Sequence, residues 1–181
     1  MKKNYLKVYS LFLFSLVFLC CKTIPPTLDF PSANNSQMVF TTPCEYKNSS
    51  IPIFSIDTTS FVNSEGFCAP TSVKFSICAK NLSKKQILDL EISLDTSSKK
   101  FLLSPKEVLY TEPAGKNILV RFESLLSPEQ MEELLSEEIQ FITIKTAPKK
   151  TDSGFSEKET FLARFNGKKI NKKLLILKKY L

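Results

Sequence analysis

The stretch TSVKFSICAK, residues 71–80, alternates apolar with polar side chains. Successive side chains of an extended strand point to opposite faces of a sheet, so a period of two predicts a β-strand with one buried face. The buried face would carry Val73, Phe75 and Ile77, and the opposite face Lys74, Ser76 and Cys78.

The same period recurs along the chain between short polar runs. It is most regular in QILDLEISLD, residues 86–95, where every second side chain from Leu88 to Leu94 is aliphatic. In residues 139–145 apolar side chains fall on both faces, as in a strand that is covered on both sides. Further strands are predicted at residues 38–42, 51–56, 101–110, 117–123 and 160–165.

One segment, SPEQMEELLSEEI at residues 127–139, has a helical period instead. Ser127 is followed by Pro128 and, three positions on, by Gln130, which is the arrangement of a capping box with proline in the first turn. The sequence therefore predicts one short helix near residues 128–139. Its apolar stripe would be formed by Met131, Leu134, Leu135 and Ile139.

Many short strands with frequent turn signals and one brief helix favour a mainly all-β fold, an antiparallel two-sheet sandwich. The pattern from Thr71 to Lys145 loosely resembles the immunoglobulin type, with the helix turning a corner between late strands. The Cys–Trp–Cys arrangement of that family is absent, because the chain has no tryptophan. A closed barrel is the alternative, and the low glycine content of four residues weighs against it.

The carboxyl end, RFNGKKINKKLLILKKYL at residues 164–181, allows two interpretations. Asn166-Gly167 is a type I′ turn signal, and we expect a hairpin there. The alternative is a helix, since Ile170, Leu174, Leu177 and Leu181 share a helical face. In either case the lysines form a candidate basic contact patch, unless they only protect a sheet edge. The patch would comprise Lys168, Lys169, Lys172, Lys173, Lys178 and Lys179.

The amino end carries three lysines among its first seven residues, followed by 14 uncharged and mostly apolar residues from Val8 to Cys21. A helix needs about 20 apolar residues to cross a bilayer, so this segment is short for a span. It fits a secretory signal, with a basic start and a hydrophobic middle. Such a segment belongs to an ordinary cleaved signal, to an uncleaved anchor or to the signal of a lipid-anchored protein.

The segment SLVFLCCK, residues 15–22, resembles the lipobox of bacterial lipoproteins, in the looser form of the spirochaetes. Phe18 and Cys20 depart from the commoner pattern. The resemblance implies that Cys21 is acylated after a signal peptide of residues 1–20. Cys20 is the second candidate, disfavoured because bulky Leu19 would then stand at the cleavage position. The chain would be exported and held by lipid in the cell envelope, most simply in the outer membrane.

Behind such an anchor, residues 21–37 contain three prolines and a polar run, so we expect a flexible tether that reaches about 50 Å at full extension. Residues 38–181 would then form a single domain. The charge of the chain is concentrated at its end. The whole sequence has a net charge of +7, and residues 145–181 contain 11 basic and three acidic residues.

Three cysteines follow the tether, at Cys44, Cys68 and Cys78. In an oxidising compartment we expect one disulfide among them, with the three pairings left open. A zinc site is disfavoured, because neither a CxxC spacing nor any histidine is present.

The sequence provides little support for catalysis. Without histidine it lacks the usual base of a nucleophilic triad, and it has no phosphate-binding glycine loop. Ser83 and Ser98, each followed by two lysines, are interpreted as loop residues. We therefore expect no enzyme activity and no cofactor.

The predicted function is that of a membrane-anchored, non-catalytic binding or adhesion module at the cell surface. Its partners would be the membrane and a protein or polysaccharide ligand, and not nucleic acid. The alternative is a periplasm-facing structural or assembly component of the envelope.

Overall fold

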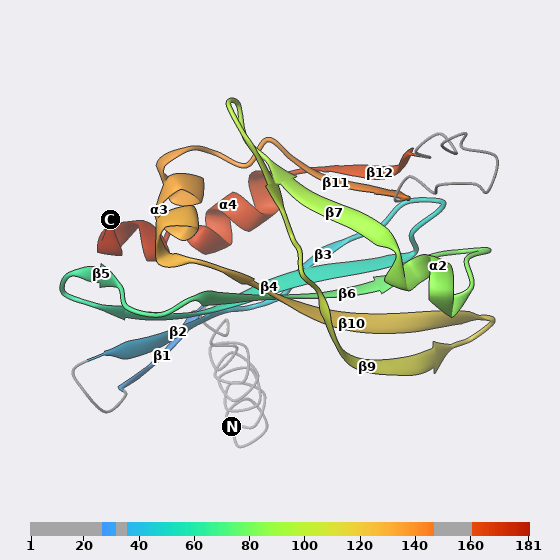
Figure 1. Cartoon of the computed structure of the whole chain (residues 1–181), viewed down its shortest axis with the longest axis horizontal. Coiled ribbons are helices and arrows are strands. Elements are labelled where there is room, and N and C mark those ends of the chain that lie inside the picture. Colours follow the sequence, from blue (N-terminus) through green and yellow to red (C-terminus); the bar gives the residue numbers. More distant parts are fainter. Residues whose placement is uncertain (1–26, 32–35, 147–160) are drawn as a thin grey trace, which may run out of the picture.

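The computed structural model describes residues 27–31, 36–146 and 161–181, which form two antiparallel β-sheets packed as a sandwich (Figure 1). The all-β sandwich prediction is confirmed. The larger sheet contains β1 (Thr27–Pro31), β2 (Gln37–Thr41), β3 (Cys44–Tyr46), β4 (Ile53–Asn63), β5 (Gly66–Phe67), β6 (Thr71–Cys78), β9 (Glu107–Ala114) and β10 (Asn117–Leu126). The smaller sheet contains β7 (Leu90–Asp95), β8 (Lys100–Leu102), β11 (Phe141–Thr146) and β12 (Phe161–Asn166).

The helices α3 (Pro128–Ser136) and α4 (Lys168–Leu174), with the 3₁₀ helix η2 (Leu177–Tyr180), cover the part of the larger sheet that the smaller sheet leaves open (Figure 1). A further short helix, α2 (Lys84–Leu88), lies at the opposite end of the sandwich and connects β6 to β7. The buried side chains of α3, α4 and η2 join the same hydrophobic core as the strands. The described residues therefore share one core.

The core is built from the alternating faces seen in the sequence. Val73, Phe75 and Ile77 of β6 are at most 1% exposed. Phe75 stacks on Phe122 of β10, with ring centroids 5.2 Å apart. From the smaller sheet, Ile142 is fully buried as well. Burying each such side chain contributes about 2 kcal/mol to folding, so the period of two selects which faces meet.

The helix predicted near residues 128–139 is α3. Ser127 caps it, because its hydroxyl accepts from the Gln130 N–H at 3.3 Å and Gln130 Oε1 accepts from the Ser127 N–H at 2.9 Å. Met131, Leu134 and Leu135 are buried, as their spacing predicts.

The strand predicted from residue 86 begins later, because residues 84–88 form α2. Ser83 and Gln86 make a second capping box, and Ile87 is the residue of this helix that is buried. The regular alternation through Leu88 hid this helix, although the Ser-x-x-Gln signal was present. The strand itself starts at Leu90.

Part of the predicted tether is also strand. Residues 27–31 form β1, which pairs antiparallel with β2 from Thr27↔Thr41 to Pro31↔Gln37. An edge strand is held by the backbone hydrogen bonds of its neighbour and needs no alternating pattern of its own. The tether prediction is therefore wrong for these residues, and only residues 22–26 lie between Cys21 and the sheet.

The hairpin predicted at Asn166-Gly167 is wrong, and the helical alternative is correct. Gly167 has φ −71°, whereas a type I′ turn needs positive φ. The glycine is required for another reason: a Cβ there would overlap the carbonyl oxygen of Ile139 and lie 2.6 Å from its carbon. Ile170, Leu174 and Leu177 are buried, as the helical face predicts, while Leu181 is 58% exposed.

The strand order supports the loose resemblance to immunoglobulin domains, which stays a prediction. When β4 and β6 to β12 are lettered A, B, C, C′, D, E, F and G in chain order, the order β4-β6-β10-β9 of the larger sheet becomes A-B-E-D, as in that family. The smaller sheet, β12-β11-β7-β8, matches G, F, C and C′. The additional strands β1, β2, β3 and β5 extend the larger sheet around β4.

β9 forms an open edge of the larger sheet and is exposed along almost its whole length. The register with β10 shifts at Leu109, which is the extra residue of a bulge. Glu107, Glu112 and Pro113 also lie in this strand. Bulges, charges and proline all hinder pairing with a further strand.

Replacing Gly167 tests the close approach to Ile139. We expect Gly167→Ala to lower the free energy of unfolding by about 3 kcal/mol, because the new methyl group has no room. Gly115→Ala is the control: its φ is +63° with no atom within 4 Å of a Cβ, so only backbone strain of about 1 kcal/mol is added. Urea unfolding measures both, and an unchanged Gly167→Ala protein would contradict the packing described.

Candidate functional site

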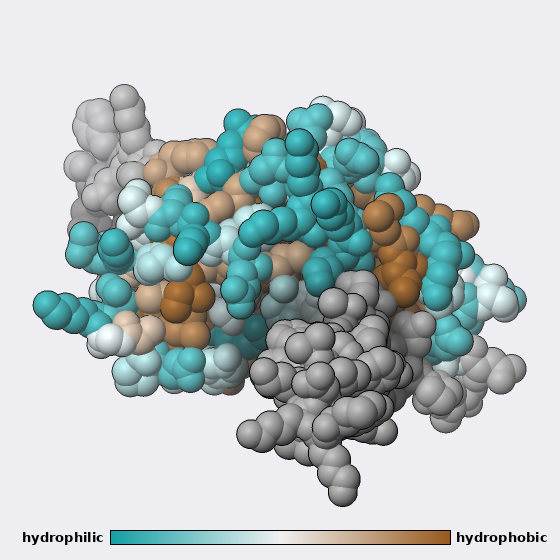
Figure 2. All heavy atoms as spheres, turned by 180° about the vertical axis from the view of Figure 1, so that it is seen from behind, coloured by the Kyte–Doolittle hydropathy of each residue, from teal (hydrophilic) through white to brown (hydrophobic). Residues whose placement is uncertain are grey.

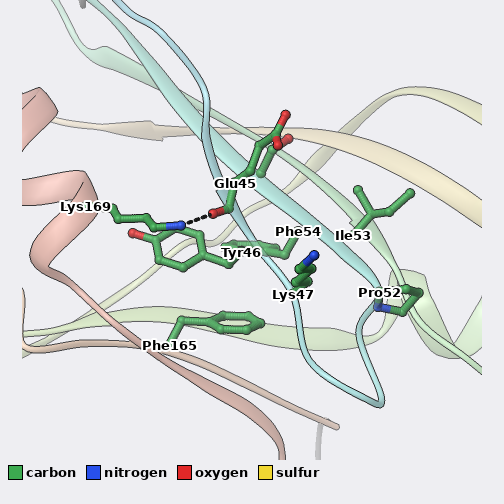
Figure 3. A pocket seen from close by; sticks show the side chains of 9 residues that line it. Glu45, Tyr46, Lys47, Pro52, Ile53, Phe54, Phe165 and Lys169 are labelled. Atoms are coloured by element: carbon green, nitrogen blue, oxygen red, sulfur yellow. Dashed lines mark hydrogen bonds between the residues drawn. The ribbon is translucent and has the colours of Figure 1, made fainter.

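Three aromatic rings from distant parts of the chain form the floor of a pocket (Figure 3). Tyr46 ends β3, Phe54 lies in β4, and Phe165 lies in β12 of the smaller sheet. The Phe54 and Phe165 rings stack with centroids 5.6 Å apart, and Tyr46 lies 5.2 Å from Phe165 and 6.0 Å from Phe54. The three residues are at least nine-tenths buried, so the floor is apolar and well packed.

The pocket has a volume of about 570 Å³ and opens where the edges of the two sheets meet α4. Such a volume falls in the range of small-molecule sites, roughly 300–1,000 Å³. Around the floor stand Glu45, Lys47, Pro52, Ile53, Ser55 and Lys169. The lining thus combines an apolar base with two cations and one carboxylate.

Tyr46 also fixes the position of α4. The helix has no side-chain N-cap, and the phenol oxygen of Tyr46 accepts a hydrogen bond from the Ile170 N–H at 3.2 Å. Asn166 Oδ1 accepts from the Lys168 N–H at 2.9 Å. These two acceptors satisfy N–H groups that the first turn of a helix leaves without partners.

Lys169 bridges the helix and the pocket wall. Its ammonium group donates to the carbonyl oxygen of Glu45 at 3.1 Å and lies 5.5 Å from the centroid of the Tyr46 ring (Figure 3). A cation at this distance is attracted to the face of the ring. Lys169 is therefore held over the rim of the pocket.

Burial controls the titration of the groups under the rim. It raises the pKa of Tyr46 to about 12, with a smaller contribution from Cys44 and an opposing one from the Ile170 N–H. Burial also raises the pKa of the Cys44 thiol, although Lys173 and Lys169 act against it. At neutral pH both groups are uncharged, and neither is suited to be a base or a nucleophile.

The six lysines of the predicted basic patch all lie on α4 and the segment through η2. Lys173 donates to the Thr42 hydroxyl, and Lys179 lies 4.8 Å from the centroid of the Tyr180 ring. Lys168, Lys172 and Lys178 line a second hollow of about 220 Å³. Its other lining residues are Glu138, Asn171 and Leu175.

The structure holds Cys44, Cys68 and Cys78 as free thiols, so the predicted disulfide is not formed. Cys44 and Cys78 pair with β4 from opposite sides, opposite Ile56 and Ile53 respectively. Two strand spacings of roughly 4.8 Å therefore separate them, more than a disulfide can bridge. Cys68 is exposed, whereas the other two are buried.

The two serines followed by lysines have structural contacts. Ser83 caps α2. Ser98 donates to Glu137, and this bond, followed by one from Thr96, lowers the pKa of Glu137 to about 2. Lys99, next to Ser98, pairs instead with Glu133. Among the described residues, no group of cysteine and acidic side chains could hold a metal ion.

The amino-terminal predictions lie outside the described residues. This applies to the signal peptide of residues 1–20, to the acylated Cys21 and to Cys20. Within the part of the chain that is described, no helix has the length and apolar character needed to cross a bilayer.

Sequence reasoning missed the aromatic pocket. Tyr46 and Phe54 lie more than 100 positions before Phe165, and only the fold brings them together. The strand pattern of residues 51–56 did place Phe54 in a strand, but no local signal connected it to the basic end. Comparison with protein family models, curated proteins and solved structures finds no match to this chain.

On the surface seen in Figure 2, hydrophilic residues predominate, and the hydrophobic ones form small separate patches. The described part of that face therefore offers no broad apolar area. The pocket of Figure 3 is the better candidate for ligand binding, because it is a hollow that combines an apolar floor with charged groups.

Tyr46→Phe tests the link between pocket and helix. We expect a loss of about 1 kcal/mol in unfolding free energy at neutral pH, because the Ile170 N–H loses its acceptor. In the folded wild-type protein the pKa of Tyr46 is raised to about 12, whereas in the unfolded chain it is about 10. As pH rises between these values the unfolded chain loses the phenol proton before the folded protein does, so the free energy of unfolding falls.

The variant should lack that part of the alkaline decline, as measured by urea unfolding at several pH values. Tyr110→Phe, which removes a phenol that is 46% exposed, is the control. The same alkaline decline in Tyr46→Phe and wild type would contradict the role given to Tyr46.

Proposed function

We propose that this chain is a bacterial lipoprotein, anchored through Cys21, whose sandwich domain binds a ligand at the cell surface without catalysing a reaction. The lipobox resemblance of residues 15–22 supports the anchor. The aromatic-floored pocket between β3, β4, β12 and α4 supports the binding role, and it is the observation that carries the proposal.

The pocket favours a particular chemistry of ligand. Tyr46, Phe54 and Phe165 pack on one another as a firm base. Ile53, which is 43% exposed above them, offers apolar surface to a flat or aliphatic group. At the rim, Lys47 and Lys169 outnumber Glu45, so an anionic group on the ligand would be oriented toward the lysines. A ligand of this class is an apolar group that carries a carboxylate or another anion, free or as part of a polymer.

Binding of 8-anilinonaphthalene-1-sulfonate, an aromatic anion, tests the pocket. The protein would be the chain from residue 21 with Cys21→Ser, and the readout the fluorescence of the bound probe. We expect one site, and Ile53→Asp at the rim should weaken it about tenfold, equivalent to about 1.4 kcal/mol. The reason is that the probe would then cover a charged group.

Leu102→Asp is the matched control, since Leu102 is 44% exposed in β8 and Ile53 is 43% exposed. It should leave the affinity unchanged. Lys169→Gln should weaken binding, and Lys116→Gln should not. If the Ile53 and Leu102 variants bound the probe equally, the pocket would not be the site.

Cys21→Ala in cells tests the anchor and the location. We expect this variant to lose its acyl group and to leave the membrane fraction, as followed by phase partition and mass spectrometry. Protease treatment of intact cells should remove the wild-type protein while a periplasmic marker survives. Membrane-bound, acylated Cys21→Ala protein would contradict the anchor, and protection of the wild type until the outer membrane is broken would favour a periplasmic role.

A further inference from the structure

β1 brings the folded domain close to the proposed anchor. Pairing with β2 begins at Thr27, so five residues separate it from Cys21. At full extension the six steps from Cys21 to Thr27 span at most about 20 Å. Any orientation of the domain on the membrane rests on the lipid anchor of the proposed function, because the tether limits the distance between the domain and the membrane only when Cys21 is anchored there.

α4 lies beside the point where this short tether enters the fold. Thr27 pairs with Thr41, and the hydroxyl of the next residue, Thr42, accepts a hydrogen bond from Lys173. At the other end of β2, Gln37 pairs with Pro31. The Tyr180 hydroxyl of η2 donates a hydrogen bond to Gln37 Oε1 at 2.7 Å. The segment from α4 to η2 therefore follows the first two strands from end to end.

The outward side of this segment is basic with an apolar centre. Lys168 and Lys172 are exposed, and Lys178 is half-buried. Leu175, which lies between Lys172 and Lys178 in the sequence, is 60% exposed. Within the described residues these three lysines form no ion pair, and Glu138 is the acidic residue that lines the same hollow. Lysines around an exposed leucine are typical of helices that lie on anionic membrane surfaces.

The helix dipole accounts for only part of the placement of the lysines. Lys172 and Lys173 stand in the last turn, where positive charge favours the dipole, whereas Lys168 and Lys169 stand in the first turn, where it opposes the dipole and no acidic residue balances it. Helix stability therefore does not explain Lys168.

We propose that the α4–η2 face lies against the anionic headgroups of the membrane that holds the lipid anchor. The short tether supplies proximity, the lysines contact lipid phosphates, and Leu175 enters the boundary between headgroups and acyl chains. Each lysine close to an anionic surface should favour the contact about fivefold. The domain would then have a fixed orientation on the membrane.

Lysine acetylation read residue by residue tests this orientation. The full-length, acylated chain is reconstituted into vesicles of phosphatidylcholine alone or of phosphatidylcholine with about one-third phosphatidylglycerol. On the anionic vesicles Lys168, Lys172 and Lys178 should react about tenfold more slowly than on the neutral ones, and high salt should remove the difference. The α2 lysines, Lys84 and Lys85, should react equally on both.

Two double variants make the test specific, with the reactivity of Lys178 as the readout. Lys168→Glu with Lys172→Glu should abolish the protection of Lys178 on anionic vesicles. The matched control, Lys84→Glu with Lys85→Glu, should retain it. Circular dichroism melting checks that both variants fold.

The outcomes separate the membrane orientation from the proposed function. If the purified chain carries no acyl group and does not float with vesicles, the anchor is wrong and the orientation is wrong with it. If the chain floats but its α4 lysines react equally on both vesicles, only the orientation is wrong. Protection that appears only after an acidic envelope polysaccharide is added would assign the face to that polymer and overturn the lipid contact.

Discussion

The packing of Gly167 against Ile139 is the constraint on which the carboxyl-terminal third of the structure depends. The Gly167 N–H donates to the Gln140 carbonyl at 2.9 Å. The Asn171 side chain donates to the Ile139 carbonyl at 2.9 Å and accepts from its N–H at 3.1 Å. Because these bonds join the α3–β11 connection to α4, the helix has one position relative to both sheets.

The position of α4 in turn links the pocket to the basic face. Phe165 precedes the helix and forms part of the floor, and Lys169 in its first turn reaches the rim. Further along the chain, Lys172 and Leu175 belong to the outward side of the α4–η2 segment. One short helix therefore borders the proposed ligand pocket on one side and carries the proposed membrane contact on the other, so a shift of α4 would change both.

The parts of the fold that local pattern determines could be predicted, and those that depend on distant contacts could not. The alternation around Phe75 placed β6, and the Ser127 capping box placed α3, because burial and capping act within a few residues. The Asn166-Gly167 pair misled, since glycine serves close packing as well as tight turns and only the fold reveals Ile139 beside it. β1 was missed because backbone pairing with β2 needs no side-chain pattern. The pocket was missed because its rings come from opposite ends of the domain.

The exposed edge of β9 has a consequence for proteins confined to a surface. Chains held on a membrane diffuse in two dimensions, so copies meet edge to edge far more often than they would in dilute solution. An open strand could then act as a template for lateral polymerisation. The bulge at Leu109 and the acidic and proline residues of β9 interrupt such a template. Under the anchoring proposed above, the features that leave this strand without a neighbour in the sheet would allow a dense population of molecules to stay separate.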